Sequence, residues 1–443
     1  MNKTILPSLA VLCLLFIPIF LQGFTTSVKA SPDIIHVPGD YAKIQWAIGN
    51  ATRGETIIVS EGIYHEHVII NKSLIIMGEN GNAIIDGNGT GHVITVCSDN
   101  VNISGFTIQN SGPDFWDSAI YTCNSSWCNI SHSILIHNGH GIWVDYHSNN
   151  NVLTGNNVSH NLVGIGLSGS CNNIVTNNYV FSSVHCGIGL SNASNNILTN
   201  NIAKNNEYGI WLDYSTNVTA TANTVTSNLY GIHLDHSDNN TIFHNNIINN
   251  TNQAEVINSA STWNGDFEGN YWSNYDGLDA YQDGIGDNPY IIDVNNTDSY
   301  PLMGTFSDFT IAWEEQLHRV TTICNSTILN FIFNATYDGL SRAIIFNVTG
   351  EDETTGFCRI RIPTALMNGN FTVYVDGVNT NYKLLLRSNA THSYLYFAYK
   401  LSTKEVVIIP ELSSIIIVPL LMILISIATL LSRRKKPAYR NVA

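Results

Sequence analysis

The sequence predicts an all-β protein whose larger part is a right-handed parallel β-helix, a solenoid of stacked coils of short strands. Three observations support this fold class. A Gly-Ile dipeptide recurs at intervals of 23, 23, 22 and 22 residues, at Gly141, Gly164, Gly187, Gly209 and Gly231. A second apolar motif lies between these dipeptides, as in NVLTGNNVSHN from Asn151 and NILTNNIAKNN from Asn196. Asparagine supplies 27 of the 104 residues from 149 to 252.

Each repeat of about 22 residues therefore holds two or three short strands joined by Asn-, Gly- and Ser-rich turns. The apolar positions are filled by β-branched residues and show no helical period. Coils of this kind stack at roughly 4.8 Å, the spacing between hydrogen-bonded strands. Asparagine suits such coils for two reasons. It tolerates left-handed turn geometry, and identical Asn side chains on successive coils can form a hydrogen-bonded ladder.

The charge of the chain excludes nucleic acid as a partner. Charged residues make up 12% of the chain, and the formal net charge is −15. Between residues 31 and 304 the cationic side chains are Lys43, Arg53, Lys72 and Lys204. Almost nothing is available there to neutralise phosphates.

Both ends of the chain carry targeting signals. Residues 1–30 predict a signal peptide, with Lys3 before an apolar stretch and Ala30 at a small-residue cleavage site. Residues 413–431 are apolar and long enough for one transmembrane helix. The basic tail 432–443 follows at once and predicts a cytoplasmic C-terminus. We therefore expect a single-pass cell-membrane protein with an extracellular or periplasmic ectodomain.

A composition change at residue 305 marks a second domain. From 305 to 410, apolar and polar residues alternate between turns such as Asp376-Gly377, which predicts an antiparallel β-sandwich. Outside the cell, Cys123 with Cys128 and Cys324 with Cys358 are candidate disulfides. Frequent Asn-x-Ser/Thr sequons predict a glycoprotein.

The segment VPGDYAKIQWAIGNATRGETIIVSEGIYHEHVIINKSLIIMGENG, from Val37, resembles the opening of the pectate-lyase-like right-handed β-helix superfamily. That resemblance implies a short helix at 41–50 covering the open end of a solenoid that spans residues 31–304. The coils resemble the repeats of surface carbohydrate-binding proteins and sugar hydrolases, and those of NosD, a periplasmic protein of copper-site maturation. Residues 263–304 contain GNYWSNYDGLDAYQDGIGDNPYIIDVNNTDSYPLM and resemble the closing segment of NosD-type helices. Copper is the cofactor that this resemblance implies.

Strand alternation predicts which repeat positions can meet a ligand. The first and third residues after each repeat glycine are Ile and Val or Leu, so they should face the interior. The second, fourth and fifth should face outward. In the first, fourth and fifth of these coils, the outward residues are Trp143, Asp145 and Tyr146; Trp211, Asp213 and Tyr214; and His233, Asp235 and His236. The two coils between the tryptophans present Gly166, Ser168, Gly189 and Ser191, which predicts a shallow trough walled by Trp143 and Trp211.

Aromatic walls beside carboxylates and hydroxyls suit a neutral saccharide, because sugar C–H faces stack on rings while hydroxyls bond to Asp. Asp213 and Asp235 occupy adjacent coils, near the separation of about 5–5.5 Å found in retaining glycosidases. They are therefore the candidate catalytic residues if the protein is an enzyme. His233, His236 and His244 could equally form a metal site with Asp235.

Cleavage of acidic polymers is disfavoured. Gly139-His140-Gly141 matches a motif of polygalacturonases, but the Asn-Thr-Asp at Asn296 follows that motif instead of preceding it. Pectate lyases use an arginine base, and the coils after Lys72 contain no arginine. A polyuronate would also meet an acidic surface.

An acidic loop predicts a structural calcium site near the end of the solenoid. In DGLDAYQDGIGD the carboxylates are Asp276, Asp279, Asp283 and Asp287, separated by glycines. Carboxylates every three or four residues in such a loop suit a hard cation. The complete interpretation is a membrane-anchored surface β-helix with a non-catalytic ectodomain that binds carbohydrate or serves as an adhesive scaffold. The alternatives are a NosD-type copper protein and a glycoside hydrolase acting on a neutral polysaccharide.

Overall fold

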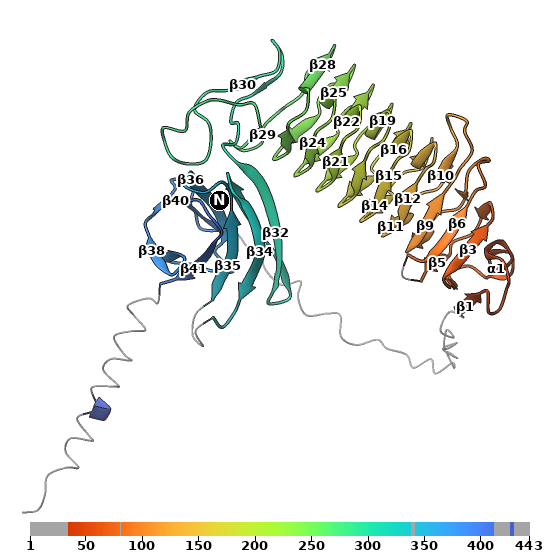
Figure 1. The fold of residues 1–443 in the computed structure, drawn as a ribbon, viewed down its shortest axis with the longest axis horizontal. Coiled ribbons are helices and arrows are strands. Elements are labelled where there is room, and N and C mark those ends of the chain that lie inside the picture. Colours follow the sequence, from red (N-terminus) through yellow and green to blue (C-terminus); the bar gives the residue numbers. More distant parts are fainter. Residues whose placement is uncertain (1–33, 80, 338–341, 412–425, 429–443) are drawn as a thin grey trace, which may run out of the picture. The chain divides into compact units, whose positions relative to one another are not determined.

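The computed structural model describes residues 34–79, 81–337, 342–411 and 426–428 (Figure 1). From residue 34 to β28 the chain is a parallel β-solenoid, in which short strands repeat coil after coil and form three long sheets. Paired isoleucines such as Ile142 and Ile165, or Ile188 and Ile210, lie one coil apart. The predicted parallel β-helix with coils of about 22 residues is confirmed.

The strands of the solenoid belong to three sheets, named A, B and C here. Sheet C contains β4 (Val68–Ile70), β7 (Ile94–Val96), β10 (Ser118–Thr122), β13 (His140–Val144), β16 (Val163–Ser168), β19 (Cys186–Ser191), β22 (Tyr208–Asp213), β25 (Tyr230–Asp235) and β28 (Asn252–Ile257). Sheet A contains β1 (Ile34–Val37), β2 (Thr56–Val59), β5 (Ile75–Gly78), β8 (Asn102–Ser104), β11 (Asn129–Ser131), β14 (Val152–Thr154), β17 (Ile174–Thr176), β20 (Ile197–Thr199), β23 (Thr219–Thr221) and β26 (Thr241–Phe243). Sheet B contains β3 (Gly62–His65), β6 (Ala83–Asp86), β9 (Phe106–Gln109), β12 (Ile134–Ile136), β15 (Asn157–Ser159), β18 (Tyr179–Phe181), β21 (Ile202–Lys204), β24 (Thr224–Thr226), β27 (Asn246–Ile248) and β29 (Tyr271–Trp272).

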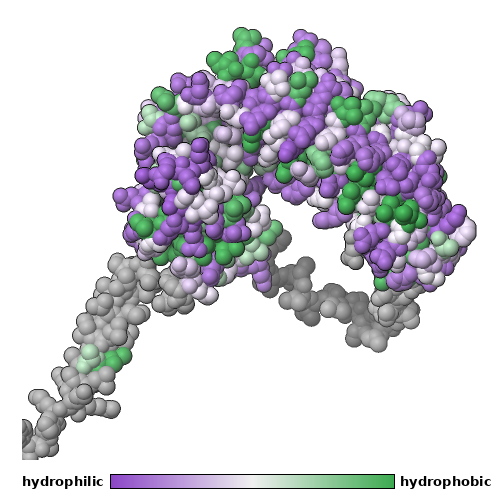
Figure 2. All heavy atoms as spheres, viewed as in Figure 1, coloured by the Kyte–Doolittle hydropathy of each residue, from purple (hydrophilic) through white to green (hydrophobic). Residues whose placement is uncertain are grey.

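The interior of the solenoid is a continuous apolar column. From β13 to β25 the inward positions of sheet C are fully buried, and they are Ile142, Val144, Ile165, Leu167, Ile188, Leu190, Ile210, Leu212, Ile232 and Leu234. The helix α1 (Ile44–Asn50) packs Ile44, Ala47 and Ile48 onto the first coils and so covers the start of this column. Polar residues cover much of the visible outer surface, where hydrophobic residues form separate patches (Figure 2).

Stacked asparagines hold the turns between sheets A and B. The longest ladder runs through Asn156, Asn178, Asn201, Asn223, Asn245 and Asn270. In each step the backbone N–H of one Asn donates to the side-chain carbonyl of the next. Residues just before the ladder positions, such as Asn177 and Asn200, have positive φ. Both predicted reasons for the asparagine content are therefore present in this turn.

The ladder ends on a carboxylate in the closing segment. The backbone N–H of Asn270 donates to Asp298 Oδ2 at 2.7 Å, and Trp272 Nε1 donates to the same oxygen at 2.8 Å. Asp298 belongs to the short strand β31 (Thr297–Asp298), which pairs with β30 (Tyr290–Ile291). Burial raises the pKa of Asp298 to about 6, although the hydrogen bonds that it accepts act in the opposite direction.

Between residues 305 and 410 the described chain forms two five-stranded antiparallel sheets. The first contains β32 (Thr305–Trp313), β33 (Gln316–Cys324), β36 (Thr355–Pro363), β40 (His392–Lys400) and β39 (Tyr382–Leu384). The second contains β34 (Thr327–Asn334), β35 (Ala343–Thr349), β41 (Lys404–Pro410), β37 (Phe371–Val375) and β38 (Val378–Thr380). Side chains of both sheets share one core, with Phe346 and Ile360 fully buried in it.

The candidate cysteine pairs differ in their surroundings. Cys324 and Cys358 lie directly opposite each other on β33 and β36, and both are buried. Cys123 is exposed, whereas Cys128 is buried. All four are free thiols in the structure.

The predicted signal peptide 1–30 and tail 432–443 lie outside the described residues, as does the predicted membrane segment 413–431 apart from residues 426–428. Within the part of the chain that the structure describes, no helix has the length and apolar character needed to cross a membrane.

The ladder predicts that neighbouring asparagines differ greatly in their contribution to stability. Asn156 accepts from the Ser133 N–H at 3.1 Å and donates to Ile130 O at 2.9 Å, besides its two bonds to Asn178. We expect Asn156→Ala to lower the free energy of unfolding by about 2–4 kcal/mol, because several buried groups lose their partners. Asn157 is exposed on β15, so Asn157→Ala should change it by less than about 0.5 kcal/mol. Denaturant unfolding of unglycosylated protein measures both variants. Equal effects would contradict the ladder's role.

The raised pKa of Asp298 in the closing segment predicts that the stability of the protein depends on pH. Its pKa is about 6 in the folded protein, against an ordinary value of 3.8. Folding therefore takes up a proton between these values, so the contribution to stability is complete below about pH 4 and is lost as the pH rises through 6. The loss is at most about 3 kcal/mol. Asp298→Asn should remove this slope from unfolding midpoints measured between pH 4 and 7. An unchanged slope in the variant would show that another group causes it.

Candidate functional site

Sheet C carries the predicted site on its outer face. The register stacks one outward residue per coil, in the order Thr95, Tyr121, Trp143, Gly166, Gly189, Trp211, His233 and Glu255. A second outward column contains Ser168, Ser191, Asp213 and Asp235, and Asp145 follows β13 beside it. Trp143 and Trp211 are therefore three coils apart, as the sequence predicted.

The trough between the two tryptophans is narrower than predicted. The ring of Trp143 lies over Gly166, so that any side chain at Gly166 would collide with it. Trp143 is consequently only 9% exposed. Tyr146 covers Gly169 in the same way but remains 57% exposed. The open floor is therefore at Gly189, and the expectation of four uncovered small residues is wrong for Gly166.

A loop that the sequence analysis missed overhangs this site. Phe115 and Trp116 precede β10 and are 52% and 57% exposed. Trp116 meets Trp143 edge-on with centroids 5.4 Å apart, and Phe115 meets His140 edge-on at 5.2 Å. Thr95 and Tyr121 are paired but 26 positions apart, as are Ile69 and Thr95, whereas the later coils of sheet C need 22 or 23. The extra residues before β10, with two adjacent aromatic residues among them, are the feature of the sequence that could have indicated this loop.

His140 lies beneath this loop. It is fully buried and stacks on Trp143 with centroids 4.4 Å apart. Burial lowers the pKa of His140 to about 4. The imidazole is therefore neutral at physiological pH and forms part of the aromatic cluster.

A cavity of about 310 Å³ opens beside the loop. It is lined by His92, Trp116, Tyr121, Trp143, Asp145, Tyr146 and Ser168. Tyr121 donates to Asp145 Oδ2 at 2.7 Å, and burial together with this bond raises the pKa of Tyr121. His92 stacks on Tyr121 at 4.3 Å. The cavity thus combines exposed aromatic faces with one carboxylate and the hydroxyls of Tyr121, Tyr146 and Ser168.

A second, smaller cavity of about 50 Å³ lies between Trp143 and Trp211, and we call it the slot. Phe115, Cys186, Gly189 and Ser191 also line it. Because Trp143 lines both cavities, they are neighbours on sheet C.

The two candidate catalytic carboxylates have separate partners. Asp213 and Asp235 pair in register on β22 and β25. Asp213 accepts from Ser191 Oγ at 3.0 Å, and Asp235 Oδ1 lies 2.7 Å from His236 Nδ1. His233 Nδ1 lies 2.8 Å from Glu255. Tyr214 is exposed and stacks on His236 at 4.7 Å. Each carboxylate thus has its own hydrogen-bond or ion-pair partner.

No group of three His, Cys, Asp or Glu side chains that could hold a metal ion exists among the described residues. The proposed ligands are therefore not gathered into one site. His244 Nε2 instead bonds Glu268 Oε2 at 2.8 Å, away from Asp235 and His236.

The acidic loop uses its carboxylates to bond its own backbone. Asp279 accepts from the N–H groups of Asp283 and Gly284 at 3.0 and 2.8 Å, and Asp287 accepts from that of Ala280 at 2.7 Å. Burial raises the pKa of Asp279, and the neighbouring carboxylates add to the effect. Asp276 is exposed. Calcium binding by these residues stays a prediction.

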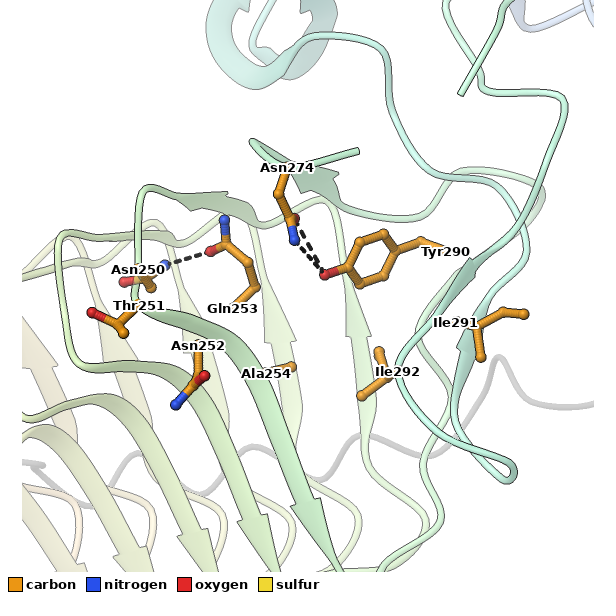
Figure 3. Close-up of a pocket in the computed structure, with 9 residues that line it drawn as sticks. All are labelled: Asn250, Thr251, Asn252, Gln253, Ala254, Asn274, Tyr290, Ile291 and Ile292. Atoms are coloured by element: carbon orange, nitrogen blue, oxygen red, sulfur yellow. Dashed lines mark hydrogen bonds between the residues drawn. The ribbon is translucent and has the colours of Figure 1, made fainter. Parts of the chain in front are cut away.

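A further pocket of about 300 Å³ lies where β28 meets the closing segment, at residues that the sequence analysis did not single out (Figure 3). Its amides bond to neighbours, since Asn250 Nδ2 donates to Gln253 Oε1 at 3.0 Å and Asn274 Nδ2 donates to Tyr290 OH at 3.1 Å. Figure 3 shows the Tyr290 ring directed toward Asn274. The pocket is polar but carries no charge.

Comparison with solved structures finds other proteins of partial similarity. A Dettilon tailspike protein is 12% identical, with a TM-score of 0.40, and the match covers 85% of this chain and 93% of that one. A pectate lyase is 14% identical, with a TM-score of 0.40 and coverage of 57% and 83%.

Comparison with sequences identifies the family. A cell surface glycoprotein of Methanothermus fervidus is 32% identical over 127 residues. The match covers 28% of this chain and only 20% of the glycoprotein. The profile of the family described as "Periplasmic copper-binding protein (NosD)" matches residues 48–277, a little over half of the chain and most of the solenoid. The chain belongs to the NosD family.

Proposed function

We propose that this protein binds a neutral polysaccharide at the cell surface through sheet C, without catalysis. The observation that carries the proposal is the cavity beside the loop. There the exposed rings of Trp116 and Tyr146 lie next to the carboxylate of Asp145. A sugar ring stacks its C–H face on such aromatics, and its hydroxyls donate to a carboxylate. A volume of about 310 Å³ accommodates a ligand of this size.

Charge supports a neutral ligand. The outward columns of sheet C present Asp145, Asp213, Asp235 and Glu255. The one cationic residue between β10 and β28 is Lys204, which belongs to sheet B. A polyuronate would meet this acidic face without a compensating cation.

The proposed location at the cell surface rests on the predicted signal peptide and membrane segment. It agrees with the name of the glycoprotein relative from Methanothermus fervidus. With residues 413–431 as the anchor, the solenoid would face outward and present sheet C to a neighbouring glycan.

Glycoside hydrolysis is a weaker candidate. A retaining mechanism needs one carboxylate free as nucleophile and one as acid. Asp213 already accepts from Ser191, and Asp235 is paired with His236. Release of reducing sugar from a neutral polysaccharide, lost in Asp213→Asn or Asp235→Asn, would nevertheless establish it over non-catalytic binding.

Copper binding is the second candidate, because the family description names it. Within the described residues, the donors that suit copper(I) best are the exposed thiols of Cys97 and Cys123. They follow β7 and β10, and the Cys123 N–H donates to Val96 O at 3.0 Å, which places them on adjacent coils. One equivalent of copper(I) retained by the purified protein, lost in Cys97→Ser and kept in Cys171→Ser, would favour this function.

The glycan proposal predicts a selective loss of binding in an aromatic variant. Trp116→Ala should weaken binding of neutral oligosaccharides by tenfold or more, since a stacking face is removed, while the solenoid stays intact. Trp46→Ala is the matched control, because Trp46 is 53% exposed but lies on α1. A glycan array followed by calorimetry measures both. Equal binding by the two variants, or no binding of any neutral glycan by the natural chain, would contradict the proposal.

A further inference from the structure

The slot between Trp143 and Trp211 is too small for a sugar ring but fits a small substituent. Its volume is about 50 Å³. One water-sized group needs roughly 10–15 Å³ of such space, so the slot has room for about four groups of that size. An acetamido group has that many non-hydrogen atoms.

The walls of the slot are almost entirely apolar. Trp143, Trp211 and Phe115 contribute aromatic rings, and Gly189 contributes no side chain. A Cβ at Gly189 would lie 2.7 Å from Cys186 Sγ and 3.8 Å from the Trp211 ring. Any side chain at Gly189 would therefore collide with Cys186. Glycine leaves the space between the two tryptophan rings uncovered, and burial of a ligand methyl group there is favourable.

One edge of the slot offers a hydrogen-bond acceptor. Ser191 Oγ donates its proton to Asp213 Oδ2 at 3.0 Å and receives a long contact from Asn192 Nδ2 at 3.4 Å. A hydroxyl oxygen has two lone pairs, so one remains for a ligand N–H. His185 also lines the slot, with its ring edge-on to Trp211 at 5.0 Å.

Charge restricts the substituent further. A carboxylate or sulfate in the slot would lie close to the carboxylate that Ser191 bonds, Asp213, and the lining contains no Lys or Arg. A simple hydroxyl could donate to Ser191 but would leave the apolar walls of the slot without a contact. A neutral group with a methyl end and an N–H satisfies both the walls and the edge.

We propose that the slot receives the acetamido group of an N-acetylated sugar, with the methyl between Trp143 and Trp211 and the amide N–H donated to Ser191. The inference rests on the proposed function and defines its ligand class. A second sugar ring of the same chain then lies over the neighbouring cavity, against Trp116 and Tyr146. Sheet C thereby binds an N-acetylated polysaccharide that runs along the axis of the solenoid.

Calorimetry with two trimers of the same linkage tests the inference. Chitotriose carries acetamido groups, and cellotriose does not. The full chain should bind chitotriose at least about tenfold more tightly, equivalent to about 1.4 kcal/mol. Gly189→Ala should remove this preference, because the added methyl group collides with Cys186 and narrows the slot. Gly49→Ala is the matched control, because a Cβ at that position meets nothing within 4 Å.

The outcomes distinguish the assignment of the slot to an acetamido group from the broader proposal that sheet C binds a glycan. If circular dichroism shows that Gly189→Ala does not fold, Ser191→Ala tests the same slot. This variant should reduce the preference for chitotriose over cellotriose several-fold. Equal affinity of the natural chain for both trimers overturns the acetamido assignment and leaves glycan binding standing. Binding of neither trimer overturns the proposed function, and the slot assignment with it.

Discussion

The structure depends on the requirement that every coil match the coil before it. Parallel strands stacked at about 4.8 Å leave no room for a change in the inward side chain or in the turn without disturbing two neighbours. Ile, Val and Leu on sheet C meet the first demand. The ladder from Asn156 to Asn270 meets the second, since it supplies partners for backbone N–H groups at turns that point into the structure. Asp298 then terminates the ladder where the solenoid closes.

The same constraint leaves the outward positions free. Nothing in the stacking of β13 to β25 requires Trp143, Trp211 or His233 at their places, because those side chains project away from the apolar column. Variation there can therefore serve recognition. The long turn between β9 and β10 extends this freedom, since Phe115 and Trp116 reach over a neighbouring coil without breaking its register.

Much of the fold could be predicted from the sequence because the repeat is regular. Gly-Ile-x-Leu identifies the inward residues, and the period identifies which coils carry Trp143 and Trp211. The finer site could not be predicted. Whether Trp143 stands upright or lies over Gly166 depends on side-chain packing that a one-letter pattern does not encode. The histidines and carboxylates of β22 and β25 alternate as expected, yet their hydrogen bonds pair Asp235 with His236 instead of collecting ligands around one ion. The acidic loop likewise satisfies its own backbone.

Sheet C is thus a face on which aromatic rings, isolated carboxylates and one small apolar slot succeed each other along the solenoid. A crystal structure of the protein with chitotriose tests this description most directly. We expect the sugar rings to lie along sheet C against Trp116 and Tyr146, with one acetyl methyl between Trp143 and Trp211. A trisaccharide seated on sheet A, on sheet B or on the C-terminal sheets would contradict it.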